Sequence, residues 1–138
     1  MVESDEQDIA DLLDRAHRIA VVGLSSNPAR PSYEVAARLQ TLGYDIVPVN
    51  PNVTEVLGVA AIPSLADIDG HIDIVDVFRR PAFATDIARD AVAIGAEALW
   101  LQLGVTSQQA RTIAESADLR YIEDRCLGVD AARHHRSR

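Results

Sequence analysis

The sequence predicts an α/β protein in which helices cover both faces of a mainly parallel sheet of about five strands. Short continuous runs of apolar residues recur along the chain, and such runs are typical of strands buried on both faces. Segments of about ten residues with helical periodicity separate these runs. A chain of 138 residues has the size of one domain, so we expect residues 1–138 to form a single domain.

The chain begins with an amphipathic helix and a buried strand. Helical spacing places Ile9, Leu12 and Leu13 on one face of residues 5–16, and this face needs a partner in the core. The apolar run over residues 19–23 ends in a glycine, as expected of a strand that passes directly into a loop.

Strands and helices alternate over the rest of the chain. We expect further strands at residues 45–49, 73–78, 98–101 and 119–122, with a short strand or turn near residues 59–62. We expect helices at residues 32–42, 81–94, 107–117 and 126–132, followed by a flexible tail at residues 133–138. Right-handed crossovers then give a doubly wound, Rossmann-like sheet, in which ligands bind beyond the carboxyl ends of the strands, where the strand order reverses.

The net charge of −8 argues against nucleic acid or an anionic membrane as partner, because a global acidic field repels both. A local phosphate site remains compatible with it, since backbone N–H groups and single arginines act at close range. No apolar run approaches the roughly 20 residues that cross a bilayer. The single cysteine, Cys126, and an acidic segment over residues 1–14 that does not resemble a signal peptide lead us to expect a cytoplasmic protein.

The loop after the first strand stands where dinucleotide-binding folds carry G-x-G-x-x-G. Only the first glycine, Gly23, is present, which disfavours ordinary NAD docking. The loop instead offers the hydroxyl groups of Ser25 and Ser26, and Arg30 precedes a helix N-terminus, a combination suited to phosphate. The alternative is a plain connecting loop in which Ser32 caps the helix.

The second strand ends in Asn50-Pro51. NAD-binding folds usually place an acid here to bind the ribose hydroxyls. The neutral amide of Asn50 is compatible with a nucleotide that carries a further phosphate near the ribose, although Asn-Pro is also a common turn pair.

Two arginines follow the third long strand. Phe78 is a candidate contact for an adenine face, and we expect Arg79, which is nearer to the strand end than Arg80, to touch a ligand phosphate. The alternative is a core phenylalanine followed by solvated arginines.

The fourth turn contains Gln102 and Gly104. Gly104 allows close approach of the backbone, and Gln102 supplies an amide. We expect Trp100 to lie in the core, because it stands inside an apolar strand.

The residues do not predict catalysis or a metal site. Cys126 begins a helix, where the pKa of a thiol can be depressed, but no histidine is placed to act as its base. Asp73 and Asp76 are three apart in a strand, so they point to opposite faces and cannot form a dyad. No Cys/His spacing typical of metal ligands is present.

Six segments together resemble the small bacterial CoA-binding proteins of the YccU type. These are similar to the CoA-binding domain of the succinyl-CoA synthetase α subunit and of ADP-forming acyl-CoA synthetases. The segments that carry the resemblance are residues 19–25, 30–33, 43–51, 75–79, 99–104 and 124–126.

The resemblance implies a Rossmann-like fold that binds coenzyme A or an acyl-CoA without catalysis. The implied contacts are Gly23, Ser25 and Ser26 along the phosphates, Arg30 paired with one phosphate, Asn50 and Pro51 beside the nucleotide, Phe78 and Arg79 flanking it, and Gln102 and Gly104 on the pantetheine side. The synthetases use a phosphohistidine on a further domain, so the resemblance transfers binding and not ligase chemistry.

Two alternatives remain open. An NAD(P)-linked oxidoreductase rests on the fold class alone. A thiol-redox role would have Cys126 form a mixed disulfide with the thiol of coenzyme A. The sequence leaves the acyl group, any protein partner and the oligomeric state undetermined.

Overall fold

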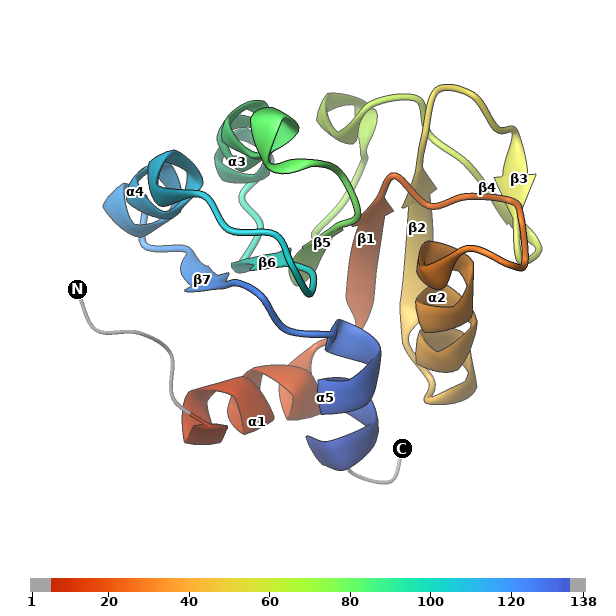
Figure 1. The fold of residues 1–138 in the computed structure, drawn as a ribbon, viewed down its shortest axis with the longest axis horizontal. Coiled ribbons are helices and arrows are strands. Elements are labelled where there is room, and N and C mark those ends of the chain that lie inside the picture. Colours follow the sequence, from red (N-terminus) through yellow and green to blue (C-terminus); the bar gives the residue numbers. More distant parts are fainter. Residues whose placement is uncertain (1–5, 135–138) are drawn as a thin grey trace.

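A five-stranded parallel sheet with the strand order β2-β1-β5-β6-β7 forms the centre of the computed structural model, which describes residues 6–134 (Figure 1). Its strands are β1 (Arg18–Val22), β2 (Asp45–Val49), β5 (Ile74–Val77), β6 (Ala98–Leu101) and β7 (Arg120–Ile122). Every neighbouring pair is parallel. The predicted α/β fold, with a mainly parallel sheet of about five strands, is therefore confirmed.

Helices cover both faces of this sheet. One layer consists of α1 (Glu6–Arg15), α2 (Pro31–Thr41) and α5 (Leu127–His134). The other consists of α3 (Ala84–Ala93) and α4 (Gln108–Ser116), with the short 3-10 helix η1 (Leu65–Asp67) beside them. Successive residues of each strand enter opposite layers, and the sheet is thus buried on both sides, as its continuous apolar runs predict.

A short hairpin stands apart from the main sheet. It consists of β3 (Glu55–Val56) and β4 (Val59–Ala60), which pair antiparallel. Ile62 continues from it and bridges Val49 at the end of β2, so the short element expected near residues 59–62 is present.

Many element ends differ from the prediction by a residue, and three differences concern how a helix begins or ends. The helix expected from residue 81 begins as the 3-10 helix η2 (Pro81–Phe83), and α3 follows it. A tight first turn of this kind is common at helix starts. Helix α2 begins at Pro31, because proline suits the first helical position. Helix α5 runs through His134, two residues into the segment expected to be a tail. Residues 5 and 135–138 of the predicted first helix and tail lie outside the described residues.

No helix within residues 6–134 combines the length and apolar character needed to cross a lipid bilayer.

Candidate functional site

A cleft of about 440 Å³ opens at the carboxyl ends of β1, β2 and β5. We call it the β1–β5 cleft, and it is lined by Gly23, Ser25, Arg30, Pro31, Ser32, Asn50, Asn52, Phe78 and Arg79. The chain leaves β1 toward the layer of α2, whereas it leaves β5 toward the layer of α3 (Figure 1). The strand order reverses between these two strands, so their connections diverge and leave room between them.

Gly23 joins the ends of three strands at the floor of the cleft. Its N–H donates to Val49 O at 2.9 Å, and Phe78 N donates to Val22 O at 2.9 Å. Its φ is +87°, and a Cβ at this position would lie 2.7 Å from Phe78 O. A side chain would therefore push the first loop away from β5, so the turn requires glycine.

Internal hydrogen bonds order the loop between β1 and α2. Ser32 Oγ accepts from Ser25 N at 3.0 Å, Ser25 Oγ accepts from Asn27 N at 3.0 Å, and Asn27 Oδ1 accepts from Ala29 N at 3.0 Å. Ser32 lies inside α2 rather than at its cap position, so the expectation that it caps this helix is wrong. Its hydroxyl instead fixes the loop that precedes the helix.

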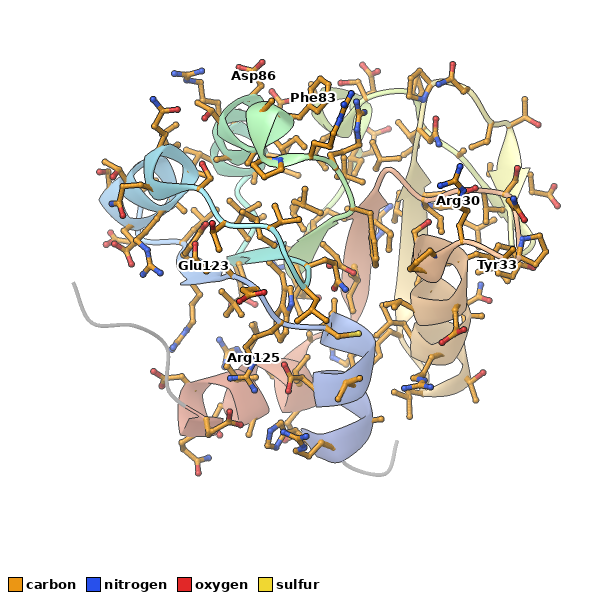
Figure 2. The ribbon with its side chains drawn as sticks, viewed as in Figure 1. Arg30, Tyr33, Phe83, Asp86, Glu123 and Arg125 are labelled. Carbon is orange, nitrogen blue, oxygen red and sulfur yellow. The ribbon has the colours of Figure 1, made fainter. Side chains whose placement is uncertain are left out.

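The start of α2 carries no side-chain cap. Arg30 occupies the cap position, makes no capping hydrogen bond through its side chain, and is exposed beside the cleft (Figure 2). The N–H groups of a first turn favour a negative charge at this end of a helix. This end of the cleft is thus suited to an anion.

A second cation lies across the cleft on the segment after β5. The Arg79 guanidinium lies 4.1 Å from the centre of the Phe83 ring, and the Arg80 guanidinium lies 5.8 Å from it. Stacking of this kind restricts the arginine without neutralising it. Within residues 6–134, neither Arg30 nor Arg79 forms an ion pair with a carboxylate.

Asn50 connects two of the loops that line the cleft. Its Nδ2 donates to Leu24 O at 3.0 Å, and its Oδ1 accepts from Asn52 N at 2.9 Å. The amide thus holds the ends of β1 and β2 together, so the turn role expected for Asn50 and its position in the cleft are both present.

Four of the sequence-predicted contacts do not line the cleft. Ser26 and Pro51 are exposed and are not among its lining residues. Gln102 is buried, and its Oε1 accepts from Leu127 N at 3.0 Å, which caps α5. Gly104 is exposed in the loop after β6, where its N–H donates to Asp124 Oδ1 at 2.7 Å. Their predicted contacts with a ligand stay predictions.

Sequence reasoning missed three lining residues and one buried acid. Pro31, Ser32 and Asn52 line the cleft, and only their position next to predicted contacts signals this. Asp76 is fully buried on β5, and neither carboxyl oxygen has a hydrogen-bond partner among the described residues. Burial raises the pKa of Asp76 well above its ordinary value, which favours the protonated form of this group in the folded protein.

Residues 17–132 match the model of a protein family described as CoA binding domain. The uncharacterized protein YneT of Bacillus subtilis is 40% identical over 129 residues, which cover 94% of this chain and 96% of that protein. The α subunit of an ADP-forming acetate–CoA ligase II of Pyrococcus furiosus is 27% identical over 122 residues; they cover 80% of this chain but 27% of the subunit. A solved structure of a hypothetical protein from Pyrococcus horikoshii OT3 superposes with a TM-score of 0.90 at 35% identity, covering 94% of this chain and 91% of that one.

Proposed function

Because the chain belongs to the CoA-binding domain family, we propose that it binds coenzyme A or an acyl-CoA in the β1–β5 cleft without catalysing a reaction. The observation that carries the proposal is the pair of arginines, Arg30 and Arg79, that line one cleft without carboxylate partners among the described residues. In a protein with a net charge of −8, two such cations in one cleft favour an anionic ligand with more than one charged group.

The chemistry of coenzyme A fits this arrangement. Its adenosine carries a diphosphate on one side and a separate phosphate on the ribose, so it presents two anionic groups. Arg30, with the uncapped start of α2, would bind one of them, and Arg79 would bind the other. Phe78, half-buried in the cleft wall, would offer an apolar surface to the adenine.

The lining of the cleft supports binding rather than catalysis. Its lining includes Ser25 and Ser32 but no histidine, cysteine or carboxylate among the described residues, so neither serine has beside it in the cleft a base of the kind that activates a hydroxyl nucleophile. The related acetate–CoA ligase subunit is far longer than this chain, so its activity does not transfer with the shared domain.

Neither alternative function gains support. The turns that would dock NAD(P) lack the later glycines and the ribose-binding acid. Cys126 lies before α5 and does not line the cleft. A cytoplasmic location stays a prediction.

Calorimetric titration of the purified chain with CoA, dephospho-CoA, NAD and NADP tests the proposal. We expect CoA to bind, and Arg30→Ala and Arg79→Ala each to weaken binding by about 1.5–3 kcal/mol, as for a charged hydrogen bond. Arg38→Ala is the matched control, since Arg38 is an exposed arginine on the same helix as Arg30 but outside the cleft. No binding of CoA, or equal losses in all three variants, would reject the proposed site.

A further inference from the structure

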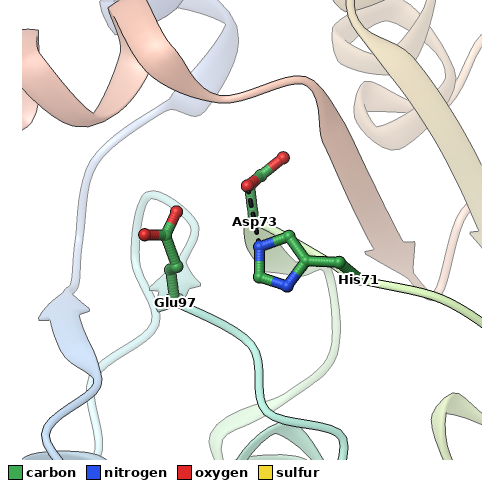
Figure 3. A group of neighbouring side chains, drawn as sticks. All are labelled: His71, Asp73 and Glu97. Carbon is green, nitrogen blue, oxygen red and sulfur yellow. Dashed lines mark hydrogen bonds and ion pairs between the residues drawn. The ribbon is translucent and has the colours of Figure 1, made fainter.

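A group of three side chains lies at the opposite edge of the sheet from the β1–β5 cleft, where the strands begin. We call His71, Asp73 and Glu97 the strand-start cluster (Figure 3). Asp73 directly precedes β5 and Glu97 directly precedes β6. One nitrogen or oxygen from each residue lies within 4.8 Å of the others. Nothing in the proposed CoA function uses these residues.

Asp73 is fixed in position before any ligand binds. Its Oδ2 accepts from His17 N at 2.8 Å and from Arg18 N at 2.9 Å, and the residue is only 8% exposed. Burial raises its pKa, but the backbone N–H groups of Arg18 and His17 and the nearby His71 outweigh burial and lower it overall. The remaining oxygen, Oδ1, is directed to His71 Nε2 at a distance of 3.0 Å.

The parallel pairing of the strands places a second carboxylate beside it. Ile74 pairs with Ala98, and Ala98 N donates to Asp73 O at 3.0 Å, so Asp73 and Glu97 stand side by side at the start of the sheet. Like charges on facing positions of neighbouring strands repel each other. A cation between them would relieve this repulsion.

The nearby arginines supply that cation only weakly. Arg15 Nε lies 3.8 Å from Glu97 Oε1, and both side chains are about two-fifths exposed, so the pair is solvent-screened. The Arg18 guanidinium donates to the carbonyl oxygens of Asp69 and His71 instead. Neither arginine forms one of these contacts with Asp73 Oδ1.

We propose that the strand-start cluster binds a divalent transition-metal ion of the zinc type. In a tetrahedral site, metal–ligand bonds of about 2.0–2.2 Å place neighbouring ligand atoms roughly 3.3–3.6 Å apart. His71 Nε2 and Asp73 Oδ1, which are hydrogen-bonded at 3.0 Å, need to separate by only a few tenths of an ångström to admit an ion, and the partly exposed Glu97 side chain closes the site by rotating about its own bonds. Imidazole with carboxylates favours zinc-type ions over magnesium or calcium, and water completes the coordination.

Metal titration of the full chain, stripped with chelator beforehand, tests this site. Calorimetry should show one Zn²⁺ bound per chain, with Mg²⁺ unable to compete. His71→Ala and Glu97→Gln should each weaken Zn²⁺ by more than about tenfold. His134→Ala is the matched control, because His134 Nε2 also lies beside a carboxylate, 3.1 Å from Glu6 Oε2, but outside the cluster. Asp73 is left intact, since its two backbone hydrogen bonds support the fold.

A fourth variant gives a result that loss of folding cannot mimic. Arg15→Ala removes the cation that competes for Glu97, so it should bind Zn²⁺ more tightly than the unchanged protein. Absence of Zn²⁺ binding at roughly 100 μM metal, wild-type affinity in His71→Ala and Glu97→Gln, or loss of binding only in His134→Ala would overturn the proposal. Titration with CoA tests the β1–β5 cleft at the other edge of the sheet, so the proposed function can fail or succeed independently of the metal site.

Discussion

Gly23 and Phe78 touch through their backbones at the floor of the β1–β5 cleft, and a Cβ at position 23 would lie 2.7 Å from Phe78 O. The contact joins the first loop to the end of β5 and thereby fixes the distance between the two sides of the cleft. Both sides carry an arginine, so this contact sets the spacing of the two cations that the proposed function requires.

Replacing Gly23 should therefore damage both the fold and the site. Gly23→Ala forces alanine into a φ of +87° and drives its Cβ against a carbonyl, so we expect a loss of more than about 2 kcal/mol in the free energy of unfolding. Urea denaturation measures the loss. Gly58→Ala is the control, because Gly58 has a similar φ of +78° but no atom within 4 Å of its Cβ position. Equal losses in the two variants would show that the contact with Phe78 has no effect.

The hydroxyl of Ser32 should matter to the order of the first loop. Ser32→Ala leaves the part-buried Ser25 N–H without its 3.0 Å partner, which typically lowers stability by about 1–3 kcal/mol. We also expect weaker binding of CoA, since the loop that carries Arg30 loses its anchor. Thr41→Ala on the same helix, whose hydroxyl bonds only to Ala37 O on the exposed face, should change neither property. Full CoA affinity in Ser32→Ala would contradict the anchoring role.

Asp76 should make the stability of the protein fall as pH rises. The pKa of this acid is raised by burial, so the folded chain keeps a proton that the unfolded chain releases above its ordinary pKa of 3.8. The contribution of Asp76 to the free energy of unfolding is then highest below that pH. It decreases by up to about 1.4 kcal/mol per pH unit until the raised pKa is passed.

Asp76→Asn removes this titration while nearly keeping the shape of the side chain. The variant should gain stability relative to the unchanged protein as pH increases from about 4 toward neutrality. Denaturation curves over this range measure the difference, with Asp86→Asn as a control on an exposed aspartate. A stability difference for Asp76→Asn that does not vary with pH would mean that folding does not raise the pKa of Asp76.

Arg125 should stabilise the start of α5, because it pairs with Asp130 on that helix and with Glu6 on α1. It donates to both carboxyl oxygens of Asp130 at 2.8 Å, and Asp130 is only 3% exposed. Arg125→Ala leaves that carboxylate buried without its principal partner, which typically costs about 3–5 kcal/mol of stability. Arg133→Ala removes an exposed arginine 3.9 Å from the same carboxylate, and thermal unfolding should show a much smaller effect. Equal melting temperatures for the two variants would contradict this assignment.

Local sequence patterns were sufficient to predict most elements of the fold. The apolar runs of β1, β2, β5, β6 and β7 identify strands buried on both faces, and Trp100 lies fully buried as its position inside such a run predicts. The turn at Gly23 and the polar loop after it could likewise be predicted as part of the cleft, because both depend on residues that are neighbours in the chain.

Gln102, Asp76 and the strand-start cluster show where this reasoning ends. Gln102 stands in a turn at a strand end, as a ligand contact would, yet its amide caps α5, which begins 25 residues later. Asp76 looks like one polar residue in a strand, and only the packing of the α1, α2 and α5 layer over that face of the sheet makes it fully buried. Glu97 is distant in sequence from His71 and Asp73, and no spacing rule connects them.

Local patterns along the chain were enough to identify the strands, the helices, the turns and the turns whose side chains suit a phosphate. The strand order, the set of side chains that line the cleft and the set that only supports the fold became known from the folded chain. These features differ in the range of the interactions behind them, because periodicity and turn chemistry act over a few residues. Contacts between strand ends depend instead on how distant segments pair, and the local pattern does not encode that pairing.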